Sequence, residues 1–202
     1  MNSEIVTTSR LADLKRKMET REARIGIIGM GYVGLPLALL FSGERFRVTG
    51  FDIAPDKVKT LNAGGSYFVR ILPEAIQEAQ NAGFRATSDY AEIARMDAVI
   101  ICVPTPLDKH HEPDLSYVTG TVESIVPHIH EGQLIVLEST TYPGTTEEVL
   151  VPLLEKNTHA GLRAARPADG LASTAAGTGT QGPQPKPETA ENPGIAVELA
   201  GR

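Results

Sequence analysis

The chain has 202 residues, enough for one ordinary domain with a hydrophobic core, or for one domain and a tail. Its net charge of -6 argues against a nucleic-acid partner, because phosphate binding favours a basic surface. No stretch approaches the roughly 18 apolar residues of a membrane span, and the polar first residues lack the apolar centre of a secretory signal, so no membrane role is expected and the cytoplasm is the default location. The single cysteine, Cys102, excludes an internal disulfide and a cysteine-based zinc site.

Strands and helices alternate along most of the chain. Residues 1–23 are predicted to form an N-terminal helical extension with the basic amphipathic stretch LADLKRKM. A membrane or calmodulin role is the alternative, but Asp13, Glu19 and Glu22 dilute the basic charge, so packing beside the domain is favoured. Short apolar runs rich in β-branched residues predict strands at 24–28, 47–52, 85–89, 97–106 and 132–140. Apolar residues at helical spacing predict helices at 33–44, 54–64, 71–84, 90–96, 114–129 and 144–157, with stops at Gly64 and Gly83.

This alternation predicts the fold class. Continuous apolar strands that alternate with helices indicate a parallel sheet covered on both faces, which makes the protein α/β. We expect a doubly wound, Rossmann-like domain over residues 24–160, with about five strands. A six-stranded version would need a further strand after the last helix, and the sequence offers no apolar run there.

The segment 161–202 has a different composition. From Pro167 onward, 11 of 36 residues are Gly or Pro, and all ten aromatic residues of the chain lie at or before Tyr142. Such a composition predicts a disordered, low-complexity tail, either a functional linker or, as fits better, the product of a frameshift or truncation between about Thr158 and Pro167. The fifth strand, around 134–137, would then be an exposed edge through which the domain self-associates or binds a partner.

A glycine pattern joins the first strand to the first helix of the domain. In GMGYVG, Gly29 permits a tight turn, Gly31 allows a pyrophosphate to approach the backbone, and Gly34 lets the helix pack close to the strand. The N-terminus of the helix then faces the phosphate charge. A tight turn without a ligand is the alternative, but the strand–loop–helix context favours dinucleotide binding.

An acidic residue supplies the second part of the pattern. Asp52 ends the second strand, 23 positions after Gly29, where a carboxylate can accept both ribose hydroxyls of adenosine and would repel a 2′-phosphate. NAD is therefore favoured over NADP. Lys57 lies one helical turn further on, and it is either near the adenosine or simply an exposed helix lysine.

Five longer motifs resemble a known family. GMGYVGLPLAL, GFDI with DKV, ICVPTPL, EPDLSYV and LESTTYPGTTEEVLVPLLE occur in this order over 24–157 and resemble the UDP-glucose/GDP-mannose dehydrogenase superfamily, in particular its UDP-N-acetylglucosamine 6-dehydrogenase branch. The resemblance implies an NAD-dependent oxidoreductase that converts the C6 alcohol of a UDP-sugar to a carboxylate for polysaccharide synthesis. It also implies a catalytic cysteine and lysine beyond this domain, so we expect no catalytic residue in this chain and no turnover by it alone.

The resemblance assigns further roles by position. The pyrophosphate would be surrounded by Gly29, Met30, Gly31, Tyr32, Val33 and Gly34, and the adenosine ribose would be held by Asp52 and Lys57. Thr105 and Thr140 would lie near the nicotinamide, and the alternative for Thr140 is a strand-end threonine that caps the helix after it. The alternative, from another class, is a non-enzymatic NAD-binding module that regulates or pairs with a full-length relative.

The remaining reactive residues are interpreted as structural. Cys102 lies at the end of an apolar strand, where burial makes a thiol inert. His110, His111, His128 and His130 are read as solvated and form no metal site. Glu147 and Glu148 lie in the first turn of a helix, where carboxylates favour the positive end.

Overall fold

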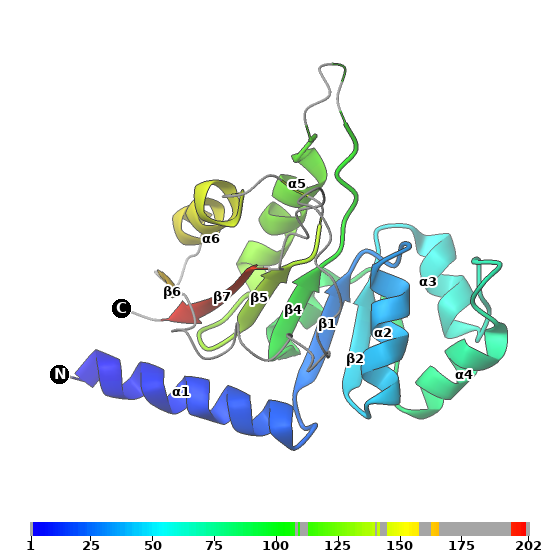
Figure 1. Cartoon of the computed structure of the whole chain (residues 1–202), viewed down its shortest axis with the longest axis horizontal. Helices are drawn as coiled ribbons and strands as arrows, with labels where there is room; N and C mark the ends of the chain where they lie inside the picture. The colour runs from blue at the N-terminus through cyan, green and yellow to red at the C-terminus, as the bar shows by residue number, and fades with distance from the viewer. Residues whose placement is uncertain are drawn as a thin grey trace, which may run out of the picture.

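The computed structural model describes residues 2–107, 109, 113–139, 141, 145–157, 163–165 and 195–200. Its centre is a sheet in which five parallel strands lie in the order β3-β2-β1-β4-β5. Figure 1 shows β2, β1, β4 and β5 side by side in this order. Each strand falls within a range predicted from the sequence: β1 (Arg24–Ile28), β2 (Arg47–Phe51), β3 (Arg85–Thr87), β4 (Ala98–Ile101) and β5 (Leu134–Leu137). This order is that of a doubly wound domain, so the predicted Rossmann-like fold is confirmed for these strands.

The predicted helices are also present. They are α2 (Gly34–Gly43), α3 (Pro55–Asn62), α4 (Pro73–Asn81), the 3₁₀ helix η1 (Tyr90–Arg95), α5 (Ser116–Ile125) with the 3₁₀ turn η2 (Val126–His128), and the π-helical turn η3 (Thr146–Leu150) that leads into α6 (Val151–Asn157). Pro55 and Pro73 occupy first helical positions, where a missing N–H costs nothing. Gly64 and Gly83 follow α3 and α4 with φ angles of 76° and 103°, the left-handed conformation that ends helices.

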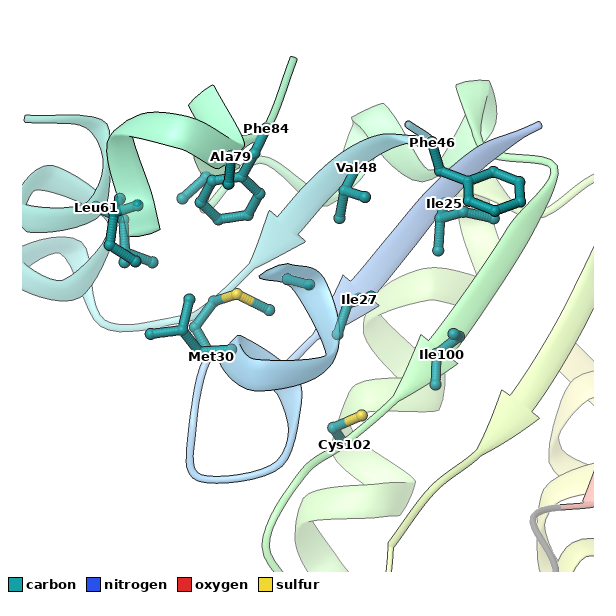
Figure 2. Packing of buried hydrophobic residues seen from close by; sticks show 14 of the residues in the cluster. Ile25, Ile27, Met30, Phe46, Val48, Leu61, Ala79, Phe84, Ile100 and Cys102 are labelled. Carbon is teal, nitrogen blue, oxygen red and sulfur yellow. The ribbon is translucent and has the colours of Figure 1, made fainter. Parts of the chain in front are cut away.

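Two apolar clusters fill the two faces of the sheet. Because successive strand residues point to opposite faces, Ile25 and Ile27 join the cluster beneath α2 and α4, whereas Ile28 joins the cluster beneath α5 and α6. Figure 2 shows the first cluster, in which Ile25, Ile27 and Met30 have no exposed surface. Burying a large apolar side chain of this kind stabilises a fold by about 1.5–3 kcal/mol.

The C-terminal segment departs from its prediction. Two strands, β6 (Arg163–Ala165) and β7 (Ile195–Ala200), extend the sheet beyond β5, and β7 runs antiparallel to β5 from Leu134↔Glu198 to Leu137↔Ile195. The expectation of a wholly disordered tail is wrong for these nine residues, and the expectation that β5 is an exposed edge is wrong as well. A six-residue strand needs no core of its own when it adds to an existing edge. Residues 166–194 lie outside the described residues, so their disorder stays a prediction.

The N-terminal helix packs as predicted. Helix α1 (Asn2–Glu19) lies across the end of the sheet at which the parallel strands begin (Figure 1). Leu14 is buried, the Lys17 ammonium lies 2.8 Å from the Asp97 carboxylate, and Arg10 pairs with Glu131. Among the described residues, no helix has both the length and the apolar character needed to cross a membrane.

Candidate cofactor-binding site

The glycine loop between β1 and α2 is shaped by close backbone contacts. Gly29 has a φ of +92°, and a Cβ there would lie 2.7 Å from the carbonyl oxygen of Cys102. A Cβ at Gly34 would lie only 1.9 Å from the carbonyl oxygen of Gly29. By contrast, a Cβ at Gly31 would meet no atom within 4 Å, so the space outside the loop is open. Two glycines therefore allow the turn, and the middle one leaves room for a ligand.

The start of α2 faces this open space without a cap of its own. Val33 is the N-cap residue and makes no side-chain hydrogen bond to the first turn. The N-terminus of a helix carries partial positive charge and free N–H groups, both of which favour an anion. Tyr32 and Val33 are 87% and 54% exposed, so their side chains leave the loop backbone accessible. The geometry fits the pyrophosphate of a dinucleotide.

Asp52 lies beside the loop and is 5% exposed. Its Oδ2 accepts hydrogen bonds from the backbone N–H of Met30 at 3.0 Å and from the Lys57 ammonium at 3.0 Å. Its Oδ1 accepts one from the N–H of Ala54 at 2.9 Å. The structure therefore brings Asp52 and Lys57 together as a charged pair, and ties this pair to the glycine loop.

Two hollows flank the loop. The first, about 410 Å³, lies on the side of Asp52 and Lys57, and the second, about 440 Å³, lies on the side of Tyr32 and Val33. Gly31, Cys102, Val103 and Pro104 border both. Thr105 lines the second hollow together with Glu138 and Ser139, while Thr140 lies outside the described residues. An extended ligand that crosses the loop can thus occupy both hollows.

Sequence reasoning missed most of the wall of the first hollow. This wall consists of Ile53 after β2, Tyr90 of η1, and the residues Ser116, Tyr117, Gly120, Thr121 and Ser124 of α5. The spacing of Ser116, Gly120 and Ser124, four residues apart, was the available signal, because it places three small residues on one helix face. Ile53 is 76% exposed, which suits it to cover a flat ring.

Cys102 has the buried setting that its position predicts. The residue is 7% exposed, and burial, followed by the negative charge of Glu138, raises the pKa of its thiol to about 12. The nucleophilic thiolate is therefore scarce at neutral pH. Cys102 borders both hollows, and we interpret it as part of their wall rather than as a nucleophile.

The histidines differ from their interpretation in one case. His130 is half-buried, and its two ring nitrogens lie 3.0 Å from the carbonyl oxygens of Met96 and Glu131, so the solvated reading is wrong for it. The sequence favoured a solvated side chain because it shows no third metal ligand near His128 and His130, and it gives no sign of these carbonyl contacts. His110 and His111 lie outside the described residues. In the part of the chain that is described, no group of three His, Cys, Asp or Glu residues is placed to hold a metal ion.

A doubly wound sheet, a glycine loop that opens onto a helix N-terminus, and a carboxylate at the end of β2 define a dinucleotide-binding domain of the Rossmann type. Comparison with known proteins narrows this class. A sequence model described as the UDP-glucose/GDP-mannose dehydrogenase family, NAD binding domain, matches residues 23–169. The chain belongs to this family, and the matched segment is its NAD-binding domain. NAD, the cofactor predicted from the sequence, is therefore confirmed.

Individual relatives agree with this assignment. UDP-N-acetyl-D-glucosamine 6-dehydrogenase of Pseudomonas aeruginosa is 37% identical over 143 residues, which are 71% of this chain and 33% of the relative. UDP-N-acetyl-D-mannosamine dehydrogenase of Escherichia coli K12 is 40% identical over 135 residues, 66% of this chain and 31% of the relative. A ternary complex of GDP-mannose dehydrogenase from P. aeruginosa has a TM-score of 0.62 at 32% identity, covering 67% of this chain and 32% of that one. The chain thus spans about a third of the length of these relatives.

Proposed function

We propose that this chain binds NAD in preference to NADP, as the cofactor domain of a UDP-N-acetyl-hexosamine 6-dehydrogenase. The observation that carries the preference is the position of Asp52 beside the glycine loop. Among the described contacts, its Oδ1 accepts only the N–H of Ala54, so this oxygen retains a lone pair for a ribose hydroxyl. A 2′-phosphate at the same place would meet the carboxylate charge directly.

The other residues take roles that follow the course of the two hollows. The loop from Gly29 to Gly34, including Met30, Tyr32 and Val33, holds the pyrophosphate against the start of α2. Asp52 and Lys57 hold the adenosine ribose, and the adenine lies in the hollow between Ile53 and α5. Thr105 and Thr140 stand at the nicotinamide end.

The substrate proposal rests on the relatives. The relatives described above carry the names of dehydrogenases for UDP-N-acetyl-D-glucosamine and UDP-N-acetyl-D-mannosamine. We extend this substrate class to the complete reaction, in which NAD accepts a hydride from C6 of the sugar in each of two steps, first to the aldehyde and then, with water, to the carboxylate. A cytoplasmic role in polysaccharide synthesis follows from this substrate class.

The NAD preference is tested by replacing Asp52 with alanine. We expect the wild-type chain to bind NADP at least about tenfold more weakly than NAD, the scale of one unfavourable charge contact. In Asp52→Ala, the loss of a charge-assisted contact should weaken NAD by on the order of 1.5–3 kcal/mol, or about 10- to 150-fold. NADP should lose less, because the repulsion disappears and Lys57 is released. Calorimetric titration at constant ionic strength measures both ligands.

Asp56→Ala is the matched control, because Asp56 is an exposed carboxylate on the first turn of α3 with no part in the contacts above. It should leave the NAD/NADP ratio unchanged. Equal affinity of the wild-type chain for NAD and NADP would contradict the proposal.

A second candidate is a non-enzymatic NAD-binding module that pairs with another protein. One observation favours it: the chain covers the edge of β5 with its own strand β7, so this edge already has a partner within the described residues. Steady NADH formation from NAD and UDP-N-acetylglucosamine by the chain alone would rule this candidate out. NAD binding without NADH formation, together with an altered rate when the chain is mixed with a full-length relative, would favour it.

A further inference from the structure

Tyr67, a residue outside every pattern discussed above, contacts both parts of the cofactor site. Its hydroxyl donates a hydrogen bond to the carbonyl oxygen of Met30 at 2.5 Å. Its ring centroid lies 5.9 Å from the Lys57 ammonium, within the range of a cation–π contact. Because Lys57 and the N–H of Met30 both bind Asp52, the four residues form a closed ring of contacts.

This closed set of four contacts fixes the peptide group of Met30 in the middle of the glycine loop. Met30 has its N–H held by Asp52, its carbonyl held by Tyr67, and its side chain fully buried in the cluster of Figure 2. The next residue is Gly31, which faces the open space outside the loop. A loop that is already held in its binding shape loses less conformational entropy when the ligand arrives.

The segment that carries Tyr67 makes a second contact with the loop. The ring of Phe68 lies 4.7 Å from the ring of Tyr32, centroid to centroid. Tyr67 itself is half-buried, and burial, followed by the charge of Asp52, raises the pKa of its hydroxyl, which therefore stays a donor across the physiological range. The plain alternative is that Tyr67 only fills space beside the α2 face of the sheet, where its ring packs against the core cluster.

We propose that Tyr67 is a positioning residue of the cofactor site, which holds the Met30 peptide so that pyrophosphate binding at the glycine loop and ribose binding at Asp52 are coupled. The inference rests on the proposed function, namely that this loop binds the pyrophosphate of NAD. It assigns the hydroxyl, rather than the ring, as the group that matters for the ligand.

Tyr67→Phe separates the two readings, because it keeps the ring and removes only the hydroxyl. We expect the dissociation constants of NAD and ADP, measured by calorimetry, to rise about 3- to 10-fold, the equivalent of one hydrogen bond. The affinity for adenosine, which has no phosphate for the loop, should change less than about twofold when followed by NMR titration. In an Asp52→Ala background, where the Met30 N–H is already released, the Tyr67→Phe effect on NAD should also fall below about twofold.

Val69→Ala is the control, since Val69 is in the same segment and is 99% exposed. It should leave all three ligands unaffected. An unchanged NAD affinity in Tyr67→Phe, or an equal loss for NAD and adenosine, would overturn the inference while leaving the proposed function intact. Failure of the wild-type chain to bind NAD would overturn the proposed function and this inference together.

Discussion

Gly34→Ala is expected to abolish measurable NAD binding and to destabilise the domain by about 3 kcal/mol or more. The added methyl group would lie 1.9 Å from the carbonyl oxygen of Gly29 and 3.3 Å from Cβ of Cys102, and the first of these atoms belongs to the backbone. Relief of the overlap requires α2 to move away from β1, which opens the glycine loop and displaces the helix N-terminus from the phosphate site. Chemical denaturation measures the stability, and calorimetric titration measures the binding.

Gly43→Ala is the matched control at the other end of α2. A Cβ there would meet no atom within 4 Å, and the φ angle of Gly43 lies outside the left-handed region. Alanine should therefore leave NAD binding unchanged and stabilise the domain by about 0.4–1 kcal/mol, because it restricts the unfolded chain. If Gly34→Ala bound NAD with wild-type affinity, the close packing of α2 on β1 would not be what shapes the cofactor site.

Removal of residues 195–202 is expected to expose the outer edge of β5 and to make the domain associate through it. Without β7, the outer N–H and C=O groups of Leu134–Leu137 lose their partners, and a short, apolar, uncharged edge is exposed. Ile135 and Leu137 face β7 and together lose up to about four backbone hydrogen bonds, which at about 0.5–1.5 kcal/mol each should cost on the order of 2–6 kcal/mol. Hydrogen exchange at the amides of Ile135 and Leu137, which face β7, should accelerate in dilute protein, whereas the Leu134 amide keeps its bond to the carbonyl of Asp97. Sedimentation should show association as concentration rises.

A shorter deletion, of residues 201–202 alone, leaves β7 in place and serves as the control. It should exchange and sediment like the intact chain. Slow exchange of β5 in a monomer that lacks 195–202 would show that another segment covers this edge, and the role assigned to β7 would then be wrong.

The order of the strands and helices could be predicted because a local sequence pattern indicates each of them. The runs RIGII and AVII are apolar and β-branched, and they became β1, at its expected bounds, and β4, which ends at Ile101 rather than at residue 106. The positions of Gly29, Gly31 and Gly34 relative to β1 and α2 were likewise predictable, because a side chain at any of these positions would hinder the turn, the ligand or the packing of α2. Asp52 was located by its distance in sequence from the loop.

The class of fold, the glycine loop and the acidic residue beside it depend on residues close together in the chain, so they could be predicted from the sequence. Three contacts became known only from the folded chain: Tyr67 reaches Met30 across 37 residues, His130 faces the carbonyl of Met96, and β7 pairs with β5. The physical reason is the same in each case. A polar group bonds to whichever partner the folded chain brings near it, and a strand can pair with any edge of the sheet that lacks a neighbour. Neither kind of contact is therefore visible in the local sequence.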